Sequence, residues 1–164
     1  MISAEASKCL FENTTKAFEE IVREISDVSI ARTDSFIISS PEVLSVIVGS
    51  LGVHGRILLT TTYEAAKNIA RFMNFGDPIE NRDEIFMYFA EFANMYCGRS
   101  ATYMNDKFGA RTVWISPPAI FAAEDLEIIS PNLVTQKAYY KADFGSFIID
   151  IGIVDDEESD FGFC

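Results

Sequence analysis

Residues 81–109 read NRDEIFMYFAEFANMYCGRSATYMNDKFG, and this stretch decides the fold. Asn81 and Glu84 have the spacing of a helix-capping box, and Gly109 is a typical helix stop, so we predict one long helix ending at about Phe108. Because consecutive helical residues are about 100° apart, the apolar side of this helix lies opposite Glu91. We expect that side to face the core through Phe86, Phe89, Ala93, Tyr96, Ser100 and Met104.

The outer face of the same helix carries a mixed set of side chains. Glu91 and Asn94 lie one helical turn apart, so a carboxylate and an amide can act together on one small target, such as a water molecule and a neighbouring ammonium. Gly98 makes the helix about 1 kcal/mol less favourable than Ala would at this position. Its lack of a side chain would allow another surface to approach the helix closely. The alternative is that Glu91 and Asn94 are ordinary residues of a solvated helix face. The residues bordering the pair are Met87, Tyr88, Met95 and Gly98.

Hydrophobic spacing on either side of this helix predicts an α+β fold, with long helices packed on an antiparallel sheet. Short links between the apolar runs favour antiparallel pairing, with a hairpin around His54 and another at Gly145. Thr61 with Glu64 indicates the start of a second helix, which ends near Gly76. The expected first helix spans residues 4–25, and the expected strands are 28–30, 36–38, 43–48, 56–60, 112–116, 133–141 and 147–154.

Composition limits the kind of protein and its partners. The chain has 164 residues, enough for one domain, which we place at residues 1–154 with an acidic tail at 155–164. The formal net charge of −12 argues against nucleic acid and anionic membranes as partners. No signal peptide or membrane span is evident. Three widely spaced cysteines without a CxxC pair favour a reducing cytoplasm, so we expect a cytoplasmic protein. Cys9 and Cys97 are expected to be buried apolar groups, and no spacing of ligands indicates a metal site.

The motif Glu91-x-x-Asn94 is followed after twenty-two residues by Pro117, in the segment Ile115-Ser116-Pro117-Pro118. With this spacing the chain resembles the CheC/CheX/FliY family of chemotaxis phosphatases, and CheX-like members most closely. The likeness extends over nearly the whole chain and implies a CheC/CheX-like fold. One position departs from the family pattern, because Met87 stands where the family has Asp or Ser. A second motif on the first helix is absent, since Leu10 stands three residues before Asn13, so one site per chain is expected.

The resemblance implies a hydrolase of two-component signalling that removes the aspartyl phosphate of a CheY-type response regulator. Asn94 would orient the attacking water, Glu91 would accept hydrogen bonds from a receiver Lys, and Pro117 would shape the site. Met87, Tyr88, Met95 and Gly98 would contact the partner. The Mg²⁺ would belong to the receiver, so the chain would need no cofactor of its own.

The resemblance also implies a homodimer, for which the apolar runs 43–48 and 147–154 are the expected sheet edges. Two other readings stay open. Met87 favours a noncatalytic module of the same fold that docks on a receiver or a flagellar component. The other is a structural dimerisation or small-ligand domain in which Glu91 and Asn94 are merely solvated.

Overall fold

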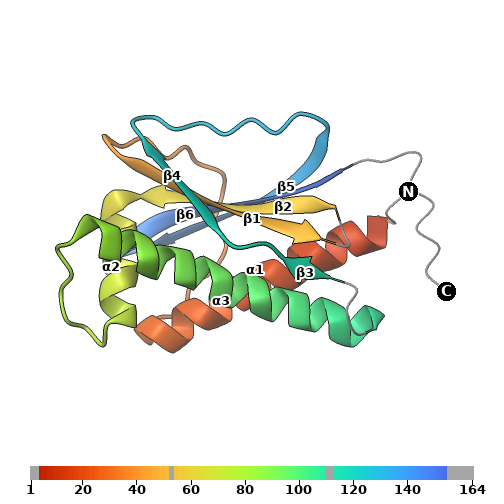
Figure 1. Cartoon of the computed structure of the whole chain (residues 1–164), viewed down its shortest axis with the longest axis horizontal. Coiled ribbons are helices and arrows are strands. Elements are labelled where there is room, and N and C mark those ends of the chain that lie inside the picture. The colour runs from red at the N-terminus through yellow and green to blue at the C-terminus, as the bar shows by residue number, and fades with distance from the viewer. Residues whose placement is uncertain (1–3, 52–53, 110–112, 155–164) are drawn as a thin grey trace.

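The computed structural model describes residues 4–51, 54–109 and 113–154, and the predicted acidic tail lies outside these ranges. Three helices cover one face of a single sheet (Figure 1). The predicted α+β fold is therefore confirmed. In chain order the elements are α1 (Ala4–Ser26), β1 (Val43–Leu51), β2 (Gly55–Thr62), α2 (Tyr63–Met73), α3 (Arg82–Phe108), β3 (Trp114–Ile115), β4 (Ala119–Ala123), β5 (Leu133–Ala142) and β6 (Gly145–Val154).

The sheet has six strands in the order β3-β1-β2-β6-β5, and β4 pairs with β1 beside β3. Every pair is antiparallel, and both predicted hairpins, β1–β2 and β5–β6, are present. The turn before β6 requires glycine, because a Cβ on Gly145 would lie 2.3 Å from the Cβ of Ala65 in α2. The β5–β6 hairpin is thereby held against the start of α2.

The core lies between the helices and the sheet, and Phe18 of α1 is its centre. Its ring contacts Phe92 and Tyr96 of α3, with centroids 5.7 and 5.5 Å away, and also Tyr140 and Phe147 of the sheet. Such edge and tilted ring pairs add to the free energy gained from burial alone. These contacts fix the rotation of α3 about its axis, which decides the residues it turns outward.

The residues buried along α3 include most of those predicted to face the core, and several others are buried as well. Phe86 is only half-buried, whereas the other five predicted residues are buried. The helix packs against α1 and α2 and also against strands β1 and β3, so a wider part of its surface is covered than one stripe. Cys97 is buried as predicted, and the buried residues that were not predicted are Ile85, Phe92 and Ala101.

Several local predictions were wrong. Residues 28–30 and 36–38 form no strand, since the backbone of this segment pairs with the sheet only at a bridge between Arg32 and Tyr140. The cap of α2 is Thr62, whose hydroxyl accepts from the Ala65 N–H, while Thr61 belongs to β2 and donates to the Ser146 carbonyl. Strand β4 was not predicted, because it is short and follows two prolines.

The predicted sheet edges were also wrong. β1 lies between β2 and the β3–β4 pair, and β6 lies between β2 and β5, so both strands are interior. Strands rich in apolar residues are typical of a sheet interior, whereas edges carry charged residues such as Lys137 and Lys141 of β5. Within the described ranges no helix is long and apolar enough to cross a bilayer.

The cap of α3 gives a test of the helix that carries the candidate site. The Asn81 side chain accepts from the N–H groups of Asp83 and Glu84, at 2.9 and 3.1 Å. We predict that Asn81→Ala lowers the free energy of unfolding by about 1 kcal/mol, measured by urea denaturation. Asn81→Gly, which keeps a favourable cap backbone, should cost only a few tenths of a kcal/mol. Equal losses in the two variants would contradict the capping role.

Candidate functional site

Glu91 and Asn94 lie on the part of α3 that the core leaves uncovered. Glu91 is exposed and Asn94 is half-buried. The Asn94 Nδ2 donates to the Glu91 Oε2 over 3.5 Å, which is long for a hydrogen bond. Among the described residues, no ion pair involves Glu91 and no hydrogen bond reaches the Asn94 Oδ1. Both groups therefore keep hydrogen-bonding capacity for a visiting molecule.

The segment 115–118 faces this pair from the edge of the sheet. Ile115 lies opposite Ser50 and Ala119 lies opposite Ile47, so the edge advances four residues while β1 advances three. One extra residue on one strand is a β-bulge. Proline has no N–H for a strand ladder and is confined to edges and bulges, which explains why Pro117 and Pro118 separate β3 from β4. The bulge moves these prolines out of the ladder and beside α3.

Ser116 fastens the bulge to β1. Its backbone N–H donates to the Gly49 carbonyl over 2.9 Å, and its Oγ accepts from the Gly49 N–H over 2.8 Å. The same hydroxyl donates to the Pro117 carbonyl over 3.1 Å. A Cβ on residue 49 would lie 3.1 Å from the Ser116 Oγ, so the absence of a side chain at Gly49 allows this close approach. Pro117 is thereby held in one position relative to α3.

Together, α3 and the bulge enclose an open surface pocket of about 440 Å³. Glu91, Asn94 and Pro117 all line this pocket. Met87, which is 66% exposed, lies at the same pocket. Sequence reasoning did not assign four of its residues to the site, although the Ser-Pro-Pro break in an edge strand was a usable signal. Those four are Ala90, Ile115, Ser116 and Pro118.

The three remaining predicted residues lie beside this pocket and do not line it. Tyr88 and Met95 are half-buried and pack against the core, and the Tyr88 hydroxyl donates to the Asn74 Oδ1 over 3.2 Å. At Gly98 the nearest neighbour of an added Cβ would be the Ile115 Cδ1 at 3.9 Å, so the surface that approaches this glycine is β3 of the same chain. Contact of these three residues with a partner stays a prediction.

The chemistry available in the pocket is narrow. Its lining supplies one carboxylate, one amide and one hydroxyl, and the Ser116 hydroxyl is already engaged with Gly49 and Pro117. Cys97 is on the same helix, but it is buried, and burial raises the pKa of its thiol far above the usual value. Cys9 is buried as well, as predicted for both. No cluster of three or more metal-binding side chains occurs among the residues that the structure describes.

The family comparison agrees with this geometry. The model of the family described as chemotaxis phosphatase CheX matches residues 44–144, which is more than half of the chain and includes both walls of the pocket. The chain belongs to the CheX family. The resemblance drawn from Glu91, Asn94 and Pro117 is thus confirmed at the level of family, while no curated protein matches the chain.

Solved structures of CheX-like proteins share the fold. Chemotaxis protein CheX from Vibrio vulnificus is 13% identical, with a TM-score of 0.74 over 87% of this chain and 95% of that one. The CheX of a CheX–CheY–BeF₃–Mg²⁺ complex from Borrelia burgdorferi is 23% identical, with a TM-score of 0.70 over 88% and 97%. Thermotoga maritima FliY is 17% identical, with a TM-score of 0.62 over 95% and 93%. At these identities the likeness shows the fold alone.

The clamp between Ser116 and Gly49 gives a second prediction. Ser116→Ala removes the acceptor of the half-buried Gly49 N–H, so we expect a loss of about 1 kcal/mol in the free energy of unfolding. Hydrogen exchange should accelerate at the Gly49 amide in particular. As a control, Ser29→Ala changes an exposed serine and should stay within about 0.5 kcal/mol of the unmodified chain. An unchanged Gly49 exchange rate in Ser116→Ala would refute the clamp.

Proposed function

We propose that this CheX-family chain is a phosphatase that hydrolyses the aspartyl phosphate of a CheY-type response regulator. The observation that carries the proposal is the pocket in which an exposed Glu91, an Asn94 whose carbonyl accepts no hydrogen bond from the described residues, and Pro117 meet, and whose one hydroxyl, that of Ser116, is engaged with Gly49 and Pro117. A site that supplies positioning groups alone suits a substrate that brings its own reactive centre. A receiver domain does so, because it carries the phosphate, a Mg²⁺ and a Lys.

In this proposal Asn94 orients the attacking water. The water oxygen forms a bond to phosphorus, the bond from phosphorus to the aspartyl oxygen breaks, and its electron pair returns to the receiver carboxylate. Both hydrogens of the water leave with the inorganic phosphate, as dihydrogen phosphate. Because phosphoryl transfer depends mainly on positioning and charge neutralisation, a side-chain amide that fixes the water in line is sufficient. The Asn94 carbonyl accepts from that water, and its amino group can donate to a phosphate oxygen.

Glu91 would orient the two proteins relative to each other. Its carboxylate accepts only a long hydrogen bond from Asn94 among the described residues, so it can form a stronger, charge-assisted bond with the receiver's Lys. Release of the Asn94 amino group in the same step leaves that amide free to turn toward the phosphate. The chain itself needs no metal in this scheme, and the Mg²⁺ is supplied by the receiver.

The CheX–CheY complex of Borrelia burgdorferi supports the choice of partner, since that relative of the same fold is bound to a CheY with BeF₃ and Mg²⁺. A homodimer and a cytoplasmic location remain predictions. If dimers form by strand pairing, the β3–β4 side of the sheet offers the freer edge. The outer edge of β5 is already met by the Thr33 N–H, which donates to the Tyr139 carbonyl.

The catalytic roles can be tested with a phosphorylated receiver and Mg²⁺. We predict that Asn94→Ala lowers the dephosphorylation rate constant by about a hundredfold or more, since a single positioned hydrogen-bonding group contributes that much elsewhere. Glu91→Gln keeps the shape of the side chain but loses its charge, so the second-order rate constant should fall about tenfold or more. The measurement is loss of receiver-bound phosphate over time.

Asp106→Asn is the matched control, because this exposed acid lies on α3 away from the pocket. Its replacement changes the net charge by the same amount as Glu91→Gln does. It should leave the rate unchanged. If the unmodified chain binds the phosphorylated receiver without accelerating hydrolysis, the noncatalytic docking module is the correct reading. If Asn94→Ala retains full activity, the proposed mechanism is wrong.

Met87 should govern binding and leave the chemical step unchanged. Its exposed thioether lies at the pocket mouth and can adapt to an apolar patch on a partner. We predict that Met87→Ala raises KM several-fold with kcat unchanged, because uniform binding is lost. Ile129→Ala is the control, since it removes an exposed apolar side chain outside the pocket. A fall in kcat with constant KM would place Met87 in the chemical step.

A further inference from the structure

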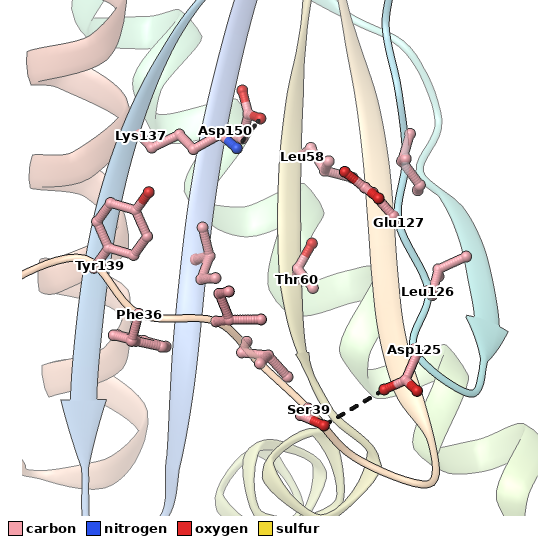
Figure 2. Close-up of a pocket in the computed structure, with 14 residues that line it drawn as sticks. Phe36, Ser39, Leu58, Thr60, Asp125, Leu126, Glu127, Lys137, Tyr139 and Asp150 are labelled. Carbon is pink, nitrogen blue, oxygen red and sulfur yellow. Dashed lines mark hydrogen bonds and ion pairs between the residues drawn. The ribbon is translucent and has the colours of Figure 1, made fainter.

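A second cavity lies on the face of the sheet that the helices leave open, and it shares no residue with the Glu91 pocket. Its volume is about 520 Å³, within the range of small-molecule sites. Figure 2 shows the strands β2, β6 and β5 as its floor, with segments 36–39 and 125–128 as its walls. The walls are joined at one end, where the Ser39 Oγ donates to the Asp125 Oδ1 over 3.5 Å.

The strand register builds the floor. Leu58 of β2, Asp150 of β6 and Lys137 of β5 form one cross-strand row, and Thr60, Ile148 and Tyr139 form the next. Because successive side chains of a strand alternate between faces, both rows project to the side away from the helices. An aspartate thus stands at the centre of an otherwise mostly apolar floor.

Asp150 is the unexpected group in this floor. It is only 8% exposed, and its Oδ1 accepts no hydrogen bond from the residues that the structure describes. The Arg56 Nη1 and the Lys137 Nζ each stand 3.6 Å from one of its oxygens, which is beyond ordinary hydrogen-bond length. A buried carboxylate without hydrogen bonds is costly, so the arrangement is incomplete as it stands.

The neighbouring cations do not complete it. The Arg56 guanidinium stays beside Asp150 as an ion pair, but its hydrogen bonds go to other acceptors: its Nε donates to the Ser130 Oγ over 2.5 Å and its Nη1 donates to the Asp150 backbone carbonyl over 3.2 Å. Lys137 is half exposed at its side chain and can swing into solvent. A ligand cation could therefore take the place that the Lys137 ammonium occupies beside Asp150 in Figure 2.

The remaining lining defines the ligand. Asp125 and Glu127 add two carboxylates to that of Asp150, against the Lys137 ammonium in the lining and the Arg56 guanidinium 3.6 Å from Asp150, so negative charge is still in excess. This balance favours a positively charged group. The rest of the lining is chiefly apolar, including Phe36, which packs edge-on against Tyr139 with ring centroids 5.5 Å apart. We propose that this cavity binds a small organic amine, with its ammonium at Asp150 and an apolar or aromatic body between the two walls.

The test uses 2-phenylethylamine as the probe, with 3-phenylpropionate and 2-phenylethanol as its anionic and neutral counterparts. Each is titrated into the ¹⁵N-labelled full chain, and the dissociation constant is read from the amide NMR shifts. We expect the amine to bind about tenfold or more tightly than either counterpart. The shifted amides should belong to β2, β5 and β6 around residues 58, 137 and 150.

Variants test how each charged side chain affects amine binding. Asp150→Asn and the exposed wall variant Glu127→Gln should both weaken amine binding, whereas Lys137→Met removes the competing cation and should strengthen it. The matched control is Glu124→Gln, an exposed acid three residues from Glu127 that does not line the cavity. Glu127 and Lys137 are both exposed, so these two variants remain informative even if Asp150→Asn fails to fold.

Three results would each overturn the proposal. The first is an amine that binds no more tightly than the carboxylate. The second is weaker amine binding in Lys137→Met. The third is that the cavity amides become protected from hydrogen exchange as the protein concentration rises and do not respond to the amine. That result would identify a second copy of the chain as the occupant. None of these measurements depends on phosphatase activity toward a receiver, so amine binding and the proposed function are tested independently.

Discussion

The packing of α3 against Phe18 is the interaction on which the candidate site depends. Phe92 and Tyr96 both contact the Phe18 ring, and the buried hydroxyls of Thr14 and Ser100 join the same two helices at 2.8 Å. These contacts fix the rotation of α3 about its own axis. Since Glu91 and Asn94 are about 60° apart around the helix, the rotation that buries Phe92 and Tyr96 leaves the polar pair at the surface.

The second requirement is a wall opposite the helix, and the edge of the sheet supplies it. β1 pairs with β2 from Val43 to Ser50 and offers its other side to two short strands. The bulge between those strands brings Pro117 toward Asn94, and the Ser116–Gly49 bonds hold it there. Because the pocket lies between a core helix and a strand edge, its two walls are fixed by separate sets of contacts. Walls fixed in this way suit the positioning role that we propose for the site.

The two faces of the sheet have different characters. The face under the helices is closed by aromatic and aliphatic packing, and the pocket that contains Glu91 and Asn94 lies at its margin. The open face keeps a buried aspartate, Asp150, whose Oδ1 accepts no hydrogen bond from the described residues, between walls formed by two long connections. Its ion pairs with Arg56 and Lys137 offset part of the cost of burying the charge, and the missing hydrogen bond leaves part of that cost uncompensated. That cost gives a physical reason to look for a ligand on the open face.

The sequence by itself determined the α+β class, the two hairpins, the bounds of α3, and the outward position of Glu91 and Asn94. It could do so because helix caps, turn glycines and the 3.6-residue period act over a few neighbouring residues. It also gave the family, because Glu91, Asn94 and Pro117 are separated by fixed intervals.

Only the tertiary structure decided which strands lie inside the sheet, how the bulge at Pro117 meets α3, and that Asp150 faces a cavity walled by residues 36–39 and 125–128. Runs such as 28–30 and 36–38 have local strand character but form no strand, because pairing needs a partner whose edge is free. That partner is set by long-range contacts, which no local pattern encodes.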